Sequence, residues 1–297
     1  MAGAGVFGGF HAKKYASLPD VELAAVFDIH LDRAEALAGP LGARAFDAIE
    51  PFLEAVDVVT VATPGATHAA IAARVIAAGK AAYVEKPLAD TLDEARALVA
   101  RAATAGIALA VGHQERVVFA AMGLFDAPER PLSVEAVRRG TPNERNRDIS
   151  CVLDLMIHDL DLGLALAGGG EAQVHASGGF DEVRAEVRFA GGTTGRFEAS
   201  RQAAARERTM RLTYPSGVVE IDFLAPSFRN TTAFALNPDF AETPAGRDPL
   251  GVSVAQFLAA VRGEADRPAV TGAEGVGALG LALQIERAAG IGTGEQE

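Results

Sequence analysis

An aspartate and a histidine four residues apart are the side chains in this sequence best suited to proton transfer. Asp154 and His158 stand in the run Asp-Leu-Met-Ile-His. A spacing of i and i+4 projects both from one face of a helix, which Asp161 should share. Oxidation of an alcohol needs a base for the hydroxyl proton, and an adjacent carboxylate can orient an imidazole. The pair predicts acid–base chemistry, with a helical ion pair or a satisfied core histidine as the alternative.

No metal site is predicted around this pair. Two possible ligands on one helix, without a further cluster of histidine or cysteine, do not suit zinc. Cys151 lies one turn before Asp154. No neighbour in the sequence activates its thiol, so we interpret it as a small core residue rather than a nucleophile.

A second motif, at the start of the chain, predicts a dinucleotide site. The run Gly3-Ala4-Gly5-Val6-Phe7-Gly8 fits G-x-G-x-x-G, whose glycines let backbone N–H groups approach a pyrophosphate at a helix N-terminus. Asp28 follows Gly8 by 20 residues and ends a strand-like run. Its carboxylate suits a ribose 2′-hydroxyl and would repel a 2′-phosphate, which favours NAD over NADP. The alternative is an ordinary glycine-rich turn with Asp28 as a helix N-cap.

A lysine follows another strand-like run. Residues 81–84 lead into Glu85-Lys86-Pro87, which places Lys86 at the carboxyl end of a parallel strand, where open α/β sheets bind ligands. A lysine there can hydrogen-bond a hydroxyl group and favour ionisation of a neighbouring acid. A surface lysine at a strand end is the alternative.

The elements that must position these residues fall into two groups. Strand-like runs at 21–27, 56–63, 81–84 and 107–111 alternate with helical stretches at 68–78 and 91–103, which predicts βαβ units and a parallel sheet. After a helix at 149–167, strand-like runs at 173–178, 183–190, 194–200, 209–214 and 218–224 predict a large, mainly antiparallel sheet. Helices at 254–261 and 273–289 follow.

We therefore expect an α/β Rossmann domain at 1–113 and an α+β domain for substrate binding and oligomerisation at 114–270. A helix in 271–297 is expected to pack back on the first domain. Only Met1 and Ala2 precede Gly3. The first Rossmann strand therefore looks truncated, which should leave its neighbours without a pairing partner.

Composition excludes several classes of function. The 297 residues are 49% hydrophobic and carry a net charge of −12 with scattered basic residues, which argues against binding nucleic acid or an anionic membrane. No apolar run reaches the roughly 20 residues of a membrane span, and no secretory signal is recognisable. A single cysteine fits a reducing compartment, so a cytoplasmic location is expected.

These features follow one order along the chain, and in that order the chain resembles the Gfo/Idh/MocA oxidoreductases, the family of glucose-fructose oxidoreductase and inositol dehydrogenase. The resemblance rests on the glycine motif, Asp28, Ala62-Thr63-Pro64 with His68, Glu85-Lys86-Pro87, Gly112-His113-Gln114-Glu115-Arg116 and the run 154–161. It covers nearly the whole chain.

The resemblance implies the roles of individual residues. Lys86, Asp154 and His158 would form the catalytic trio, with His158 as the general base. The cofactor would be lined by the glycine motif and Asp28, together with Thr63, Pro64, His68, Glu85, Lys86 and Gln114. Arg116 would meet the substrate, as would Asp154 and His158. Apart from the resemblance, Arg145 in the loop 141–148 could meet a diphosphate or a sugar acid, with a solvated charged loop as the favoured alternative. The region around 112–116, 152–162 and 199–208 is most similar to bacterial members acting on UDP-N-acetylglucosamine at the sugar 3-hydroxyl.

The expected activity is reversible hydride transfer between NAD and a secondary alcohol of a sugar, sugar nucleotide or cyclitol, in a homodimer or homotetramer. Two departures favour a rival, a dinucleotide-binding sensor or scaffold without turnover. One is the short first strand. The other is Val117-Val118-Phe119, where family members usually continue with Phe-Asn-Pro.

Overall fold

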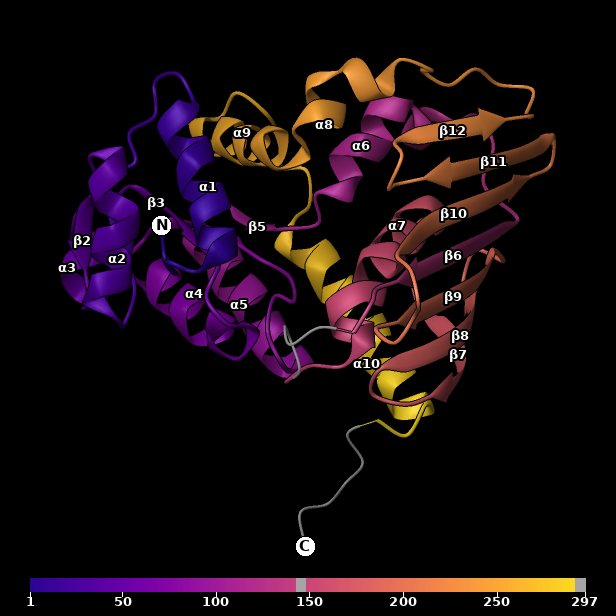
Figure 1. Ribbon diagram of the computed structural model, residues 1–297, viewed down its shortest axis with the longest axis horizontal. Helices are drawn as coiled ribbons and strands as arrows, with labels where there is room; N and C mark the ends of the chain where they lie inside the picture. Colours follow the sequence, from indigo (N-terminus) through magenta and orange to yellow (C-terminus); the bar gives the residue numbers. More distant parts are fainter. Residues whose placement is uncertain (143–147, 292–297) are drawn as a thin grey trace, which may run out of the picture. The chain divides into compact units, whose positions relative to one another are not determined.

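The computed structural model describes residues 1–142 and 148–291, and the chain divides into two compact units (Figure 1). Unit 1 contains Met1–Val117 and Asp248–Val276, and unit 2 contains Val118–Arg247 and the residues from Gly277 onward. Relative to the expected boundaries, residues 248–270 return to unit 1. The last long helix, expected on the first domain, begins in unit 1 and continues in unit 2.

Unit 1 is built on parallel strands, as the alternating pattern predicts. Strand β1 pairs with β2, and β3, β4 and β5 form a second parallel group. Their bounds are Ala25–Phe27 for β1, Arg44–Phe46 for β2, Val58–Val61 for β3, Ala81–Val84 for β4 and Leu109–Val111 for β5. Strand β4 is buried along its whole length, which is typical of a parallel strand covered on both faces.

The helices of unit 1 follow the strands. They are α1 (Val6–Ser17), α2 (Leu31–Ala38), α3 (Ile49–Glu54), α4 (His68–Ala77), α5 (Leu92–Ala105) and α9 (Pro249–Arg262), with 3-10 turns at Gly39–Leu41 and Gly65–Thr67. Helix α5 begins with a capping box between Thr91 and Glu94 and ends at Gly106, which adopts the left-handed conformation (φ 65°) that glycine tolerates. Helix α6 (Glu115–Met122) passes from unit 1 into unit 2.

The expectation of unpaired neighbours at the first strand is wrong for the residues beside the glycine turn. Ala2 lies between β1 and β3 and donates its N–H to the Thr60 carbonyl at 2.8 Å, while its own carbonyl accepts from Ala62 at 2.9 Å. On the other side the Phe27 N–H donates to the Met1 carbonyl at 2.8 Å. Elsewhere in the described part of the chain β1 and β3 are not paired with a strand between them, and the parallel strands remain two groups, β1-β2 and β3-β4-β5.

Unit 2 contains a seven-stranded sheet in the order β12-β11-β10-β6-β9-β8-β7 (Figure 1). Neighbouring strands are antiparallel except β6 and β9, which are parallel. The strands are β6 (Ser133–Arg139), β7 (Ala172–Gly178), β8 (Glu182–Phe189), β9 (Thr194–Ser200), β10 (Glu207–Tyr214), β11 (Gly217–Asp222) and β12 (Ser227–Asn230). The predicted fold class, a Rossmann domain with a large and mainly antiparallel second sheet, is confirmed.

One face of this sheet is covered by a helix and the other is exposed. Along β8 the residues alternate strictly between exposed and buried. The covering helix begins as one turn of π-helix, η4 (Val152–Met156), and continues as α7 (Ile157–Ala167). A Cβ at Gly163 would lie 3.0 Å from the Phe197 ring, so α7 packs closely on the inner face.

The rest of unit 2 is helical or irregular. Short turns lie at Leu124–Asp126 and Phe240–Glu242, α8 spans Pro244–Arg247, and α10 spans Gly272–Ala288 across both units. Among the described residues, no helix combines the length and the apolar character that a membrane span requires.

Candidate active site

The glycine turn leads directly into helix α1. Gly3 has φ +98°, and a Cβ there would lie 2.6 Å from the Ala62 carbonyl oxygen. A Cβ at Gly8 would lie 1.9 Å from the Gly3 carbonyl oxygen, whereas one at Gly5 would meet no atom within 4 Å. Gly5 is the N-cap of α1, and Val6 and Phe7 in its first turn are exposed. The backbone of the turn therefore leaves no room for a side chain at Gly3 or Gly8, whereas the space beside Gly5 contains no protein atoms.

Asp28 lies beside this turn at the end of β1. Its Oδ2 accepts a hydrogen bond from the Ala4 N–H at 2.9 Å, and its Oδ1 accepts one from the His30 N–H at 3.0 Å. The carboxylate is half-buried. Strand β1 thus delivers a carboxylate to the glycine turn, and two backbone N–H groups fix its orientation.

The loop after β3 carries Thr63 and Pro64 and leads into α4, which begins at His68. The Thr67 hydroxyl donates to the Thr63 hydroxyl at 2.8 Å. The His68 ring is buried, with Nδ1 at 2.7 Å from the Pro87 carbonyl oxygen and Nε2 at 2.9 Å from the Thr63 carbonyl oxygen. His68 therefore joins the loop after β3 to the turn after β4.

Glu85, at the carboxyl end of β4, is the centre of a buried polar cluster. Its Oε1 lies 2.7 Å from His11 Nε2 and accepts a hydrogen bond from Gln114 Nε2 at 2.9 Å. A Cβ at Gly112 would lie 2.7 Å from both carboxylate oxygens, so the backbone packs against the carboxylate. Burial opposes ionisation, but the His11 hydrogen bond and nearby cationic groups, including Lys86, lower the pKa of Glu85 overall.

Tyr83 extends this cluster to helix α9. Its hydroxyl lies 3.0 Å from Ser253 Oγ and 3.5 Å from Gln114 Nε2, and its ring meets the His11 ring edge-on at a centroid distance of 5.3 Å. Burial and the charge of Glu85 raise the pKa of Tyr83 well above its usual value, so its hydroxyl stays protonated. Lys86 follows the cluster and is half-buried.

Arg116, expected at the substrate, is engaged within unit 1. It is 8% exposed, and its guanidinium lies 3.1 Å from Glu274 Oε1. Glu274 also accepts hydrogen bonds from the backbone N–H and the hydroxyl of Thr271 at 2.8 and 2.9 Å. Arg145, the other residue expected there, lies outside the described residues.

In unit 2 the predicted pair lies on the π-turn and the helix that follows it. Asp154 and His158 are half-buried, whereas the flanking residues Leu153, Ile157 and Asp159 are buried. Both side chains, like Leu155 between them, therefore lie on the more accessible side of a mostly buried helix. Asp161, expected on the same face, is only 1% exposed. The π-turn changes the angular spacing along the helix, and irregularities of this kind are frequent at functional sites.

Residues far away in sequence support this helix. Ser150 Oγ accepts from the N–H groups of Val152 and Leu153 at 3.1 and 3.2 Å and donates to Glu286 Oε1 at 2.5 Å. Arg201, directly after β9, approaches Asp154 Oδ2 to 3.9 Å.

The sequence offered little to identify these supporting residues. His11, Ser150, Arg201 and Glu286 gave no signal, because their partners are fixed only by the fold.

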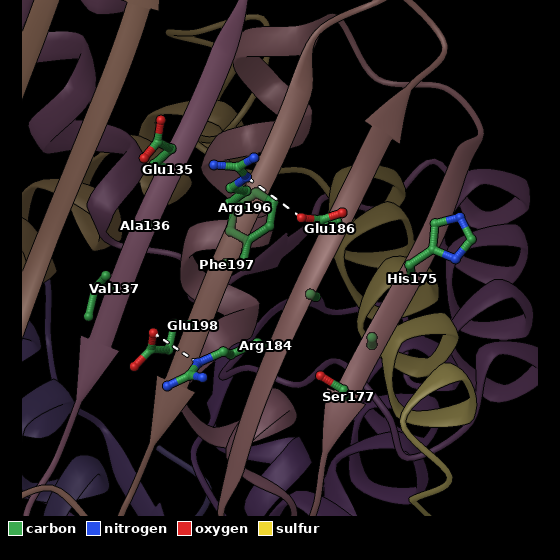
Figure 2. Close-up of a pocket in the computed structure, with 12 residues that line it drawn as sticks. Glu135, Ala136, Val137, His175, Ser177, Arg184, Glu186, Arg196, Phe197 and Glu198 are labelled. Atoms are coloured by element: carbon green, nitrogen blue, oxygen red, sulfur yellow. Dashed lines mark hydrogen bonds and ion pairs between the residues drawn. The ribbon is translucent and has the colours of Figure 1, made fainter.

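Two other features bear on the site prediction. Cys151 is fully buried, and burial raises the pKa of its thiol to about 12, which agrees with a core role. Shallow hollows open on the exposed face of the seven-stranded sheet, lined by residues that include Glu135, His175 and Arg196 (Figure 2). None of the predicted catalytic residues lines them.

Comparison with known proteins gives consistent matches. A family model described as "Oxidoreductase family, NAD-binding Rossmann fold" matches residues 1–113. The chain is 34% identical over 305 residues to UDP-N-acetylglucosamine 3-dehydrogenase of Acidithiobacillus ferrooxidans, covering 96% of this chain and 95% of the relative. It is 28% identical over 226 residues to inositol 2-dehydrogenase of Rhizobium meliloti, covering 68% of each.

Solved structures agree with these matches. The structure of the Acidithiobacillus ferrooxidans dehydrogenase superposes with a TM-score of 0.87 at 33% identity, over 97% of this chain and 96% of that chain. A protein of gentamicin A biosynthesis, solved in complex with NAD, superposes with a TM-score of 0.80 at 25% identity, over 97% of this chain and 93% of that one.

Proposed function

We propose, from the premise that this chain belongs to the Gfo/Idh/MocA family of oxidoreductases, that it transfers hydride reversibly between NAD and a secondary hydroxyl of a nucleotide sugar. The observation that carries the proposal is similarity along nearly the whole chain to a UDP-N-acetylglucosamine 3-dehydrogenase. UDP-N-acetylglucosamine, oxidised at its 3-hydroxyl, is therefore the first candidate substrate. A cyclitol is the second, because an inositol 2-dehydrogenase is also a relative.

The residues of the glycine turn fit a dinucleotide. The backbone at Gly5 is open, and the N-terminus of the 12-residue helix α1 favours a negatively charged group. We assign the pyrophosphate contact to the backbone from Gly3 to Gly8. Asp28 would accept hydrogen bonds from ribose hydroxyls and repel a 2′-phosphate, which favours NAD over NADP. Asp28→Ala should shift the ratio of NADP to NAD affinity toward NADP.

The family resemblance is the basis for assigning the remaining cofactor residues. On that basis Thr63, Pro64 and Lys86 are assigned direct contacts with the cofactor. His68, Glu85 and Gln114 are assigned a positioning role, because their hydrogen bonds join backbone and side chains of unit 1.

We assign proton transfer to His158. Bound NAD supplies the nicotinamide that accepts the hydride. His158 takes the hydroxyl proton of the substrate, and Asp154 on the same helix stabilises the imidazolium that results. Lys86, whose ammonium is a donor only, hydrogen-bonds the reacting oxygen and favours loss of its proton.

The test is NADH production with UDP-N-acetylglucosamine and, separately, with myo-inositol. His158→Asn should lower kcat by about 100-fold or more while the Kd for NAD changes little. Lys86→Met should lower kcat by a similar factor and should also weaken NAD binding, because Lys86 is assigned a contact with the cofactor. Lys80→Met, which removes a lysine just before the opposite end of β4, is the matched control and should keep wild-type kcat. Turnover of myo-inositol alone would select the second substrate, and full activity of His158→Asn would refute the assigned base.

We propose that the exposed face of the seven-stranded sheet joins copies of this chain into a homodimer or homotetramer. The strand registers place one row of residues across all seven strands with alternating charge. From β12 to β7 the row is Arg229, Glu220, Arg211, Glu135, Arg196, Glu186 and His175. Figure 2 shows Glu135, Arg196, Glu186 and His175 along this row. A row of alternating charge can meet its own copy with opposite charges opposed.

Analytical ultracentrifugation, which follows sedimentation, measures the oligomeric state of the chain directly. Arg196→Glu places like charges beside Glu186 and Glu135 and should raise the dissociation constant of the oligomer, as should high salt. Arg101→Glu, on the exposed side of α5, is the matched control. A wild-type chain that stays monomeric at all concentrations contradicts the proposal.

We place the protein in the cytoplasm. The support is the single cysteine, which is buried and reduced, together with an activity that needs NAD. Fractionation of cells should find it with cytosolic markers.

A further inference from the structure

Arg201 lies beside one of the proposed catalytic residues. It directly follows β9, and its side chain is 7% exposed. One terminal guanidinium nitrogen lies 3.9 Å from Asp154 Oδ2, and the Asp154 side chain is itself only 13% exposed. At this depth an opposite charge interacts more strongly than at the surface, because little water screens it. The charge of Arg201 therefore attracts the Asp154 carboxylate toward the end of β9.

The guanidinium of Arg201 is held in place from its other side. Nε donates to Asp181 Oδ1 at 3.0 Å, and a terminal nitrogen lies 2.7 Å from the same oxygen. The guanidinium also stands 5.3 Å from the Phe180 ring centroid and donates to the Phe180 carbonyl at 3.4 Å. Because a guanidinium is a planar fork, these contacts fix the direction in which its remaining N–H groups point.

The segment that carries Asp154 is fixed to the same support. The Cys151 N–H donates to the Phe180 carbonyl at 2.8 Å, and the Arg201 N–H donates to the Asp181 carbonyl at 2.8 Å. The π-turn, the 180–181 segment and the end of β9 therefore form one hydrogen-bonded assembly. Within it, the guanidinium and the carboxylate of Asp154 have little freedom to separate.

We propose that Arg201 is a positioning residue that holds the Asp154 carboxylate in a single orientation, with Asp181 and Phe180 as its anchor. The inference rests on the proposed role of Asp154 in the reaction. Arg201 itself touches neither the substrate nor the cofactor in this proposal. Its contribution is to present Asp154 on the side of the helix where His158 is also accessible.

The chain offers a matched control on the neighbouring strand. Arg138, on β6, is also buried and binds an aspartate of the same helix, with Nε and a terminal nitrogen at 2.9 and 2.8 Å from the carboxylate oxygens of Asp159. Asp159 is 2% exposed, unlike Asp154. The Arg138–Asp159 pair therefore resembles the Arg201–Asp154 pair in its buried arginine and its charges, but the carboxylate of Asp159 is not accessible.

The experiment compares Arg201→Lys, Arg201→Ala and Arg138→Lys in the full chain with UDP-N-acetylglucosamine, measuring kcat, KM, the Kd for NAD and the melting temperature. Arg201→Lys should lower kcat by about 10-fold and Arg201→Ala by about 100-fold, because small displacements of a catalytic group reduce the rate strongly. The Kd for NAD should be unchanged. Guanidinium ion at a non-denaturing concentration should restore part of the kcat of Arg201→Ala. Arg138→Lys should lower the melting temperature while keeping kcat.

A second variant tests the anchor without removing the arginine. Asp181 is 47% exposed, so Asp181→Asn should fold and should lower kcat by a smaller factor than Arg201→Lys. Wild-type kcat in Arg201→Ala would overturn the proposal. Losses of kcat in the Arg201 and Arg138 variants that simply follow their melting temperatures would also overturn it.

The Asp154→Asn variant distinguishes the role assigned to Asp154 from the role proposed for Arg201. Full activity in that variant would remove the assigned role of Asp154, whereas an inactive Asp154→Asn with fully active Arg201 variants would reject only the role of Arg201.

Discussion

The imidazole of His11 lies 2.7 Å from the carboxylate of Glu85, from Nε2 to Oε1, although 74 residues separate them in sequence. His11 belongs to the helix that starts at the glycine turn, and Glu85 directly precedes Lys86. Both side chains are buried. Because a carboxylate only accepts, Nε2 carries the hydrogen. Among the described residues, Nδ1 of this ring has no hydrogen-bond partner, so the contact with Glu85 is the one that orients the ring.

Two substitutions of His11 should distinguish the loss of its hydrogen-bond donor from the change in side-chain shape. His11→Leu leaves the buried carboxylate with one donor fewer, which should cost about 1.5 to 3 kcal/mol of unfolding free energy and weaken NAD binding. His11→Gln keeps an N–H donor near the position of Nε2 and should lie closer to the wild type in both properties. Urea unfolding and calorimetric titration with NAD provide the two measurements.

The control for this prediction is Phe10→Leu, one residue earlier on α1, where the side chain is 48% exposed. It should change neither property appreciably. Equal behaviour of His11→Leu and His11→Gln would show that the hydrogen bond to Glu85 contributes nothing.

Two alanine substitutions in the glycine motif should have opposite consequences. Gly8→Ala places a Cβ at 1.9 Å from a backbone oxygen, so the turn must move and the unfolding free energy should fall by about 2 kcal/mol or more. Gly5→Ala meets no atom, so stability should be kept while the methyl group obstructs the approach of a pyrophosphate. Thermal unfolding together with NAD titration distinguishes the two. A stable Gly5→Ala with wild-type NAD affinity would place the cofactor elsewhere.

Acid should destabilise the protein partly through Glu85. Its pKa in the folded chain is lowered from 4.5, so the ionised carboxylate stabilises the fold above that pH. This contribution should disappear as the pH falls through the lowered folded pKa. Glu85→Gln should therefore reduce the unfolding free energy near neutral pH, and its difference from the wild type should shrink in acid. Urea unfolding across the acid range measures this, and a constant difference at every pH would disprove the linkage.

Glu286 should show the opposite pH dependence. Burial raises its pKa from 4.5, partly offset by the hydrogen bond from Ser150 and the charge of Arg287. The protonated form of Glu286 contributes its full stabilisation below pH 4.5. This contribution is lost as the pH rises through the raised pKa of the folded chain. Glu286→Gln keeps an acceptor for Ser150 without the charge, so it should be more stable than the wild type at alkaline pH and equal to it in acid. Glu35→Gln, at an exposed position on α2, should show no such trend.

The sequence pattern located those strands in which apolar residues form a continuous run or alternate regularly with polar residues. Strands β4 and β9 lie at the predicted residues because each is a short apolar or strictly alternating run between turn signals. Strand β6, near the middle of the second sheet, was missed. Its inward positions include Arg138, which a pattern of apolar residues does not admit. The carboxylate of Asp159, from another element, pairs with this buried guanidinium and offsets the cost of its burial.

The same distinction applies to the candidate site. The glycine motif, Asp28 and Lys86 could be assigned because each lies at a strand end or helix start that local sequence defines. The helix face of Asp154 and His158 was predicted, but Asp161, which was expected on the same face, is buried.

The amino-acid sequence by itself determined which chemical groups this protein has, the order of most of its strands and helices, and the family to which it belongs. These properties depend on residue type and on neighbours within a few positions. Tertiary structure alone decided that His11 meets Glu85, that Ser150 joins Glu286, and that Arg201 approaches Asp154. Each of these contacts joins segments separated by tens of residues or more. Their geometry follows from how strands and helices pack, and a periodic pattern carries no information about the distance between remote side chains.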